Sequence, residues 1–270
     1  MKRLFLCALF TLAGTAAWAG VVIEMEVTDS PSEVEAATDT IYADGKKLRI
    51  DPHESQGGGR MSMIFRDDEL WILDHDKKRC QTIDKQGIEE LSTEIGGAMK
   101  EMEAQLAKLP PDQRAMMEKM MKNRMPGGMG QEAPPRRIEK GATEQVGEYS
   151  CTVHTLFSGD EKVWEVCSAK ESAVSEFAEA MEAFQAMSEF TKQLREMAMS
   201  GPFANMMETP FSDMEAVGGA PIRVRTFARG QMQSESTLKS VSRQEIDESL
   251  FAKPTGYKAK KLADEIKRGR

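Results

Sequence analysis

Histidine and cysteine, which supply most metal ligands and many nucleophile–base pairs, are scarce in this sequence. Its 270 residues include three histidines and four cysteines, and no histidine has a second His or Cys at metal-ligand spacing. No Gly-x-Ser-x-Gly or Walker loop occurs, and Gly57-Gly58-Gly59 is followed by Arg60 rather than by Lys-Ser and a helix. A zinc site, a nucleotide loop and hydrolase chemistry are therefore disfavoured, and the sequence predicts no enzyme activity and no cofactor.

An excess of positive charge and a long apolar segment are also missing. Lys and Arg number 36 against 44 Asp and Glu, for a net charge of -8, so no nucleic-acid partner is predicted. Beyond residue 19 no apolar run reaches the roughly 20 residues that a membrane-spanning helix needs. Hydrophobic residues still make up 40% of the chain, which is enough to fill the core of one large domain.

The N-terminus has the pattern of a secretory signal peptide. Two basic residues at positions 2 and 3 precede an apolar stretch over 4–12, and Ala17-Trp18-Ala19 supplies the small residues of a cleavage site. We therefore expect residues 1–19 to be removed and the mature protein to be periplasmic.

Residues 21–83 show the period of β-strands. Apolar and polar residues alternate from Val21 to Thr28, Ala43-Asp44-Gly45 is a hairpin turn signal, and further short alternating runs continue to Ile83. The connections are too short for crossover helices, so an antiparallel meander is predicted and parallel pairing is disfavoured.

The period then changes to that of a helix. From position 88 an apolar residue recurs at steps of three and four until Pro110-Pro111 ends the stretch. A second, methionine-rich helix is predicted to follow up to Met125, so that residues 88–125 form a helical-hairpin insert that lies over the sheet as a lid. The Gly- and Pro-rich stretch 126–141 is predicted to be a mobile loop.

Three cysteines remain after the signal peptide: Cys80, Cys151 and Cys167. Strands return near position 143, and a three-residue loop over 158–160 places Cys151 directly opposite Cys167, at the separation that a disulfide needs. A two-residue turn at Gly159-Asp160 instead slips the register and moves Cys167 to the other face. Because disulfides persist in the periplasm, we predict the bond Cys151–Cys167 and a free Cys80.

A further amphipathic helix is predicted after this hairpin. Ser168 and Glu171 form a capping box. The apolar face that follows has the helical period and carries Val174, Phe177, Met181, Phe184, Met187, Phe190, Leu194 and Met197. Two alternating stretches between positions 222 and 241 then predict a last hairpin. The basic residues 258–270 are predicted to form a tail that is solvated or leans on anionic lipid.

Four features coincide in a way that is typical of one family. A period-two strand starts directly after the signal peptide, and three motifs follow: YADGKKLRID at 42–51, LWILD at 70–74 and LFAKPTGY at 250–257. Over residues 20–85 and 142–257 the chain thereby resembles an uncharacterised bacterial exported-protein family related to the periplasmic lipoprotein carriers LolA and LolB. The resemblance implies an open half-barrel around helices, with an apolar cavity that holds acyl chains in the carriers, and it implies no catalytic residue.

The predicted fold is therefore of the α+β class. We expect residues 20–257 to form an open antiparallel β half-barrel, LolA-like, with helices packed on its concave face and the Met-rich helical hairpin inserted.

Methionine distinguishes both helical regions. Of 20 methionines, eight lie between positions 99 and 129 and seven between 181 and 214. Methionine also packs ordinary cores, but its flexible, polarizable side chain is typical of surfaces that accept varied apolar partners. The predicted apolar cavity is lined by Met99, Met102, Met117, Met121, Phe177, Met181, Phe184 and Phe190.

The leading functional hypothesis is a periplasmic, non-enzymatic binding protein for an acyl chain, a lipid or a lipidated protein, acting as a carrier or an envelope sensor. The alternative is a copper(I) protein, because the thioethers between Met116 and Met125 suit Cu(I), although no Cys or His stands among them. The acidic clusters Asp67-Asp68-Glu69 and Asp74-His75-Asp76 resemble cation or base sites, but such clusters usually shape hairpin turns.

Overall fold

The computed structural model describes residues 20–29, 36–54, 59–110, 112–114, 134–198 and 216–261. The predicted signal peptide, the second helix of the insert beyond residue 114 and most of the basic tail lie outside these ranges. Among the residues that are described, no helix is both long and apolar enough to cross a membrane.

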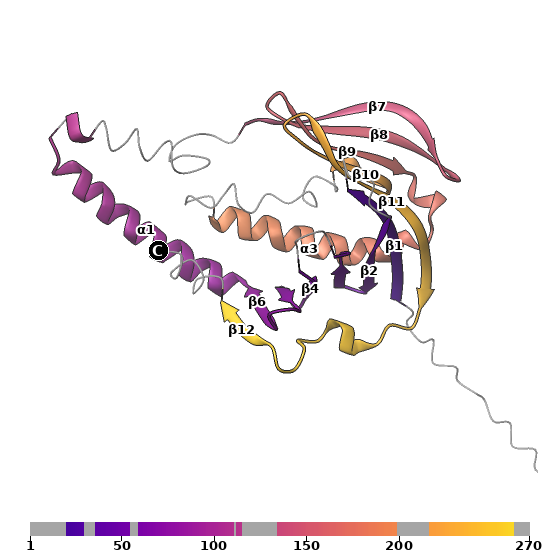
Figure 1. Ribbon diagram of the computed structural model, residues 1–270, viewed down its shortest axis with the longest axis horizontal. Helices are drawn as coiled ribbons and strands as arrows, with labels where there is room; N and C mark the ends of the chain where they lie inside the picture. The colour runs from indigo at the N-terminus through magenta and orange to yellow at the C-terminus, as the bar shows by residue number, and fades with distance from the viewer. Residues whose placement is uncertain are drawn as a thin grey trace, which may run out of the picture.

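Twelve strands form one open sheet (Figure 1). From edge to edge the order is β12-β6-β5-β4-β3-β2-β1-β11-β10-β9-β8-β7. The bounds are β1 Gly20–Asp29, β2 Ala37–Asp44, β3 Lys47–Asp51, β4 Met61–Arg66, β5 Glu69–Asp74, β6 Arg79–Ile83, β7 Arg136–Val146, β8 Tyr149–Ser158, β9 Glu161–Ala169, β10 Ala220–Ala228, β11 Gln231–Gln244 and β12 Lys258–Lys261. Neighbouring strands are antiparallel except for β12 and β6. The predicted open antiparallel half-barrel is confirmed.

Acidic residues shape the turn between β4 and β5. Asp67 and Asp68 both have positive φ, 52° and 58°, as the two central residues of a type I′ hairpin turn require. Aspartate tolerates this conformation better than most residues. The Arg66 Nε donates a hydrogen bond of 2.8 Å to Asp67. The acidic cluster Asp67-Asp68-Glu69 therefore has a structural role in this turn.

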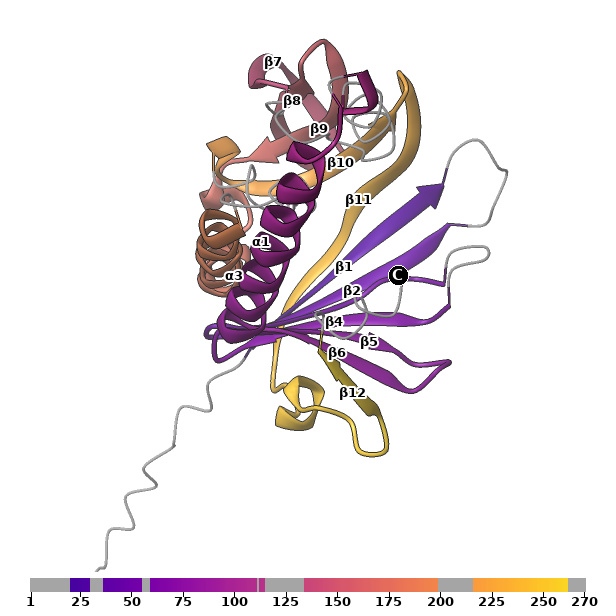
Figure 2. The same ribbon diagram turned by 90° about the vertical axis from the view of Figure 1, so that its left-hand side faces the viewer.

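Two long helices lie together on one side of the sheet, α1 over Lys85–Ala107 and α3 over Phe177–Ala198 (Figure 2). Asp84 caps α1 by accepting a hydrogen bond of 2.6 Å from the Gly87 amide. The helix α3 packs against β1, β2 and β3, and its buried face consists of Phe177, Ala180, Ala183, Met187, Phe190 and Leu194. The predicted apolar face is thus confirmed at Phe177, Met187, Phe190 and Leu194, and the two alanines extend it.

The predicted capping box at Ser168 is wrong. Ser168 lies in β9, where its hydroxyl donates to the Gly218 carbonyl. The chain first passes through a 3₁₀ turn, η1, over Glu171–Ala173, and α3 begins only at Phe177. The Ser168 hydroxyl, which the motif predicts to cap a helix, thus donates its hydrogen bond to the Gly218 carbonyl instead.

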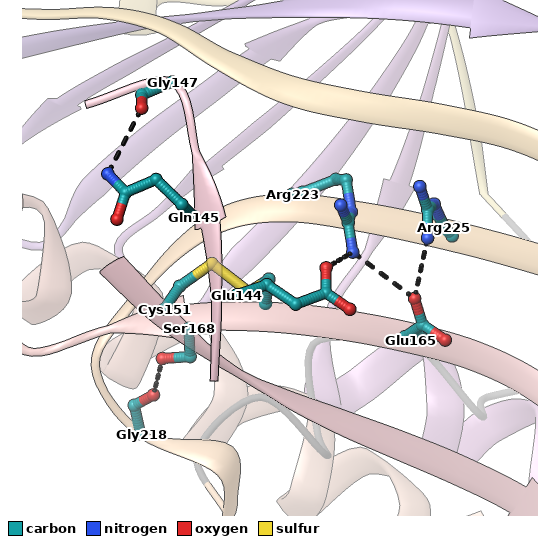
Figure 3. The surroundings of a disulfide bond; sticks show 10 residues. Glu144, Gln145, Gly147, Cys151, Glu165, Ser168, Gly218, Arg223 and Arg225 are labelled. Atoms are coloured by element: carbon teal, nitrogen blue, oxygen red, sulfur yellow. Dashed lines mark hydrogen bonds and ion pairs between the residues drawn. A yellow bond between two sulfur atoms is a disulfide. The ribbon is translucent and has the colours of Figure 1, made fainter. Parts of the chain in front are cut away.

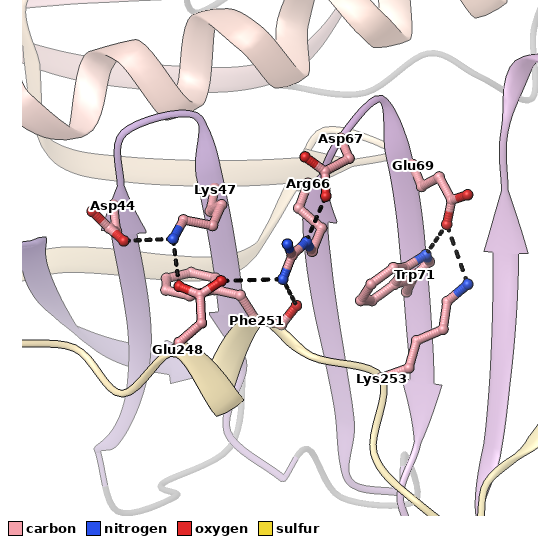
Figure 4. A network of polar contacts seen from close by, with 9 residues as sticks. All are labelled: Asp44, Lys47, Arg66, Asp67, Glu69, Trp71, Glu248, Phe251 and Lys253. Atoms are coloured by element: carbon pink, nitrogen blue, oxygen red, sulfur yellow. Dashed lines mark hydrogen bonds and ion pairs between the residues drawn. The ribbon is translucent and has the colours of Figure 1, made fainter.

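Over β2 to β6, the opposite side of the sheet is covered by residues 245–257, the C-terminal strap. Phe251, in the 3₁₀ helix η3 over Glu248–Phe251, is fully buried with Ile64, Trp71 and Leu73. Polar contacts hold the strap on both sides of this ring (Figure 4): Arg66 donates to the Phe251 carbonyl at 3.2 Å, and Lys253 pairs with Glu69 at 3.2 Å. The family-like ending of the sequence is therefore a structural anchor.

Two predicted boundaries are corrected. The mobile loop expected over 126–141 gives way to strand at Arg136, because β7 pairs with β8 from Arg136 onward. The basic tail expected from 258 begins instead with the strand β12, which pairs with β6 in parallel. Both strands lie at sheet edges, where one neighbour suffices and no apolar alternation is needed.

The predicted disulfide Cys151–Cys167 is confirmed, with a Cα–Cα distance of 5.2 Å (Figure 3). Cys80 is a buried free thiol. The predicted direct pairing is wrong, because Cys151 lies opposite Ala169 and Val153 opposite Cys167. The turn is the two-residue Gly159-Asp160 alternative. A register shift after Leu156 adds one residue to β9, which returns Cys167 to the face of Cys151.

Replacement of both half-cystines, Cys151→Ala with Cys167→Ala, is expected to lower the free energy of unfolding by about 3 kcal/mol, because the bond closes a loop of 16 residues in the unfolded chain. Urea unfolding measures this loss. Reductant should destabilise the wild type and leave the double variant unchanged. An unfolding midpoint of the wild type that does not respond to reductant contradicts the prediction.

Phe251→Ala is expected to lower the free energy of unfolding by about 3–5 kcal/mol, because it leaves a cavity beneath the C-terminal strap. The neighbouring Leu250→Ala is the control, since Leu250 is only half-buried and its contribution to the strap is a carbonyl that accepts from Arg49. Equal losses in the two variants, measured by urea unfolding, speak against Phe251 as the anchor.

Candidate ligand-binding face

The helix side of the sheet carries two adjacent apolar rows that run across the strands. The inner row is formed by successive cross-strand partners from β1 to β6: Val21, Ala43, Leu48, Phe65, Leu70 and Ile83. Its members are buried except for Ile83, which is half-buried. The Phe65 ring lies 5.4 Å from that of Phe190 on α3, so the inner row is the sheet's contribution to the core.

The outer row lies on the same face of the sheet, and each of its residues is two positions from the inner-row residue of the same strand. It runs from Ile23, which is fully buried, through Ile41, Ile50, Met63 and Ile72 as successive partners. The last four are half-buried, and we use the name outer row for them. Because each is paired with the next across neighbouring strands, they form one continuous apolar strip.

A polar rim borders the outer row. Two positions further along on the same face, Met61 lies opposite Asp74, which lies opposite Arg79, and Met61 is 38% exposed. On β2 the corresponding position is Asp39, opposite Met25. An apolar strip with charged groups along one side suits an amphipathic ligand better than a purely apolar one.

His53 contacts two carboxylates at this rim, those of Asp39 and Asp29. Its backbone N–H and its ring Nδ1 donate to Asp39 Oδ1 at 2.8 and 2.7 Å, and its Nε2 lies 3.4 Å from Asp29. Partial burial lowers the pKa of His53, but the hydrogen bonds and charges of Asp39 and Asp29 outweigh it and hold that pKa above its ordinary value. Among the described residues, no group of three or more His, Cys, Asp or Glu side chains is arranged to hold a metal ion.

The residues predicted to line the cavity occupy different environments. Phe177 and Phe190, at 2% and 1% exposure, fill the core. Phe184, stacked on Phe177 with ring centroids 5.9 Å apart, and Met181 are half-buried at the margin of the core. Met99 and Met102 lie on α1, but the placement of their side chains falls outside the description, as do Met117 and Met121 altogether. A cavity lined by this set stays a prediction.

Sequence reasoning missed the outer row as candidate site residues. Its signal was present, since Met61, Met63 and Phe65 alternate, and so do Leu48 and Ile50. Alternation identifies the face, but only the tertiary structure shows which positions on that face are half-buried.

The sequence offered no nucleophile–base pair, but the structure contains one. Hydrogen bonds join the Ser62 hydroxyl to His75 Nε2 at 2.6 Å and the Tyr257 hydroxyl to His75 Nδ1 at 2.7 Å. Ser62 is only 3% exposed, on the side of the sheet that the C-terminal strap covers. A hydroxyl buried in this way does not meet a substrate, so the arrangement fastens Tyr257 to the sheet.

Comparison with known proteins gives one family match. The model of a family described as a domain of unknown function (DUF4412) matches residues 97–257. Among curated proteins no match is found.

Two solved structures are similar over most of the chain. An uncharacterised conserved protein from Thermus thermophilus has 7% identity and a TM-score of 0.45, with 90% of this chain and 91% of that chain covered. A LolA superfamily protein from Nitrosomonas europaea has 6% identity and a TM-score of 0.30, with 87% and 89% covered. The latter is a member of the superfamily that the sequence motifs resemble. At these TM-scores the fold assignment rests on the strand order and helix packing described above.

The stability of the wild type relative to His53→Gln is expected to fall as the pH rises. A raised pKa in the folded state means that protonated His53 contributes stability fully below the ordinary pKa of about 6.5 and loses it as the pH passes the folded-state pKa. The difference in unfolding free energy between the two proteins, measured from about pH 5 to pH 9, should therefore be largest at the acid end.

The difference between the two proteins isolates His53 from the other histidines. Burial lowers the pKa of His154, so its contribution to the unfolding free energy rises with pH. This contribution is the same in both proteins and cancels in the difference. A difference that is constant with pH contradicts the prediction.

Proposed function

The chain belongs to the family described as a domain of unknown function (DUF4412), and from the geometry of its concave face we propose that it is a non-enzymatic binding protein for a long apolar ligand. The ligand class is an acyl chain, a lipid or a lipidated protein, held along the outer row. The protein acts as a carrier or sensor in the periplasm.

The observation that carries this proposal is the half-buried outer row, Ile41, Ile50, Met63 and Ile72. Three of its members, Ile41, Ile50 and Met63, pack against the margin of the core. Four strands at a spacing of about 4.8 Å give a strip roughly 14 Å long, which is the shape of an alkyl chain. Each Å² of apolar surface that a ligand removes from water there contributes about 25 cal/mol.

The polar rim supports an amphipathic ligand in particular. A chain that lies on the outer row brings its polar end to Asp39, His53 or Asp74 at the tips of the strands. These groups already hold hydrogen bonds or ion pairs within the protein, so the rim is structured before a ligand arrives. Methionine on the strip supplies an adaptable contact.

Two independent observations support the periplasm as the compartment. The N-terminal sequence has the pattern of an export signal, and the bond Cys151–Cys167 is of the kind that persists outside the cytoplasm. The basic residues of β12, Lys258, Lys260 and Lys261, lie at a sheet edge. Contact of this edge with anionic lipid headgroups would bring the protein to its ligand's source.

Ile72→Asp is expected to weaken the binding of a fluorescent fatty acid to the delipidated protein at least tenfold, because the ligand would cover an ionised carboxylate without a partner. The matched control is Ile138→Asp on β7, where the isoleucine is 36% exposed and far along the sheet order. Circular dichroism and thermal unfolding should show that both variants keep the fold. The proposal fails if the folded wild type binds the probe without saturation, or if both variants bind it equally.

A further inference from the structure

A cavity unrelated to the outer row lies where β7, β8 and β9 meet η1. Its volume is about 660 Å³, within the range that is typical of small-molecule sites. It is lined by Thr143, Glu148, Tyr149, Ser150, Thr152, Ser168, Lys170, Ser172 and Ala173. We call it the hydroxyl cavity, because six of these nine side chains end in a hydroxyl group.

Strand pairing aligns the hydroxyl groups on its floor. Thr143 lies opposite Thr152, and Thr152 lies opposite Ser168, on three consecutive strands. Directly paired residues share a face of the sheet, so three hydroxyls stand in one row. Ser150 precedes Thr152 by two positions on β8 and therefore adds a fourth on the same face.

One of these hydroxyls has a fixed orientation. The Ser168 Oγ donates its proton to the Gly218 carbonyl (Figure 3), which leaves its lone pairs as acceptors directed away from that bond. Tyr149 is held as well, since it packs against the core. Burial and the neighbouring Glu148 raise the pKa of Tyr149, so its hydroxyl stays protonated near neutral pH. The cavity thus offers acceptors and donors at set positions.

The charge and polarity of the cavity narrow the ligand class. Lys170 and Glu148 balance one another, so the lining has no net charge with which to select an anion. Hydroxyls that both donate and accept match a ligand that itself consists of hydroxyls.

We propose that the hydroxyl cavity binds a neutral saccharide. This is a second binding activity, separate from the apolar ligand of the outer row, since none of the residues of that row lines the cavity. Sugars are polyhydroxylated ligands whose hydroxyl groups match the row of hydroxyls on β7–β9.

Titration of the ¹⁵N-labelled full chain with chitotriose, maltotriose and inorganic phosphate tests the proposal by amide chemical shifts. At least one of the two sugars should produce saturable shifts centred on the lining residues, and phosphate should not. Thr152→Val, which keeps the shape of the side chain and removes one hydroxyl of the row, should weaken that binding about fivefold, the effect of losing one net hydrogen bond.

The matched control is Thr155→Val. Thr155 lies on the same strand, is half-buried like Thr152, and points to the other face, since it is an odd number of positions away. Its variant should bind the sugar as the wild type does. The absence of saturable shifts with either sugar overturns the proposal, as do preferential binding of phosphate and equal affinities of the Thr152 and Thr155 variants.

Discussion

The rest of the structure depends on the packing of α3 against the inner row. Ala180 and Ala183, both fully buried, have side chains small enough for the helix to approach the strands closely, and Phe177 and Phe190 fill the space on either side of them. An α-helix is about 10 Å wide, whereas residues on one face of a strand recur about every 7 Å. Helix α3 alone is therefore wide enough for little more than one row. The outer row is half-buried at the margin of the core.

An open sheet also has a second face to cover, and over β2 to β6 the C-terminal strap does so. Phe251 is buried on that face, while Arg66, Lys253 and their acidic partners hold the backbone on either side of it. The strap leads directly into β12, which extends the sheet by one parallel strand. The C-terminal strap thus brings the chain back to the sheet, where β12 pairs with β6.

Several polar groups that resemble reactive sites in the sequence have structural roles. Asp67 and Asp68 form a turn, and His75 connects Ser62 to Tyr257. His53, by contrast, lies at the rim of the candidate face between two carboxylates. The structure therefore divides the titratable groups into those that hold the strap and those that border the ligand face, a division that residue type alone does not indicate.

Local patterns predicted most of the strands, the presence of α1, most of the apolar face of α3 and several of the hairpin turns, because period and turn chemistry act over a few residues. The edge strands β7 and β12 escaped this reasoning. The exposed residues of β7 need no alternation, and β12 pairs with β6, which precedes it by almost 180 positions. Ser168 was assigned to a helix cap because the capping motif does not reveal that Gly218 competes for its hydroxyl.

The sequence by itself determined the class of the fold and the helix face that enters the core, since both follow from spacing along the chain. It also identified the correct cysteine pair, although from a direct pairing that the structure does not have. Only the tertiary structure decided the register that makes the bond diagonal, the two strands that close the edges, and which apolar residues remain half-buried. The physical reason is the same in each case. A β-bulge, a parallel edge pair and the width of a helix over a twisted sheet are relations between segments distant in sequence, and no local period encodes them.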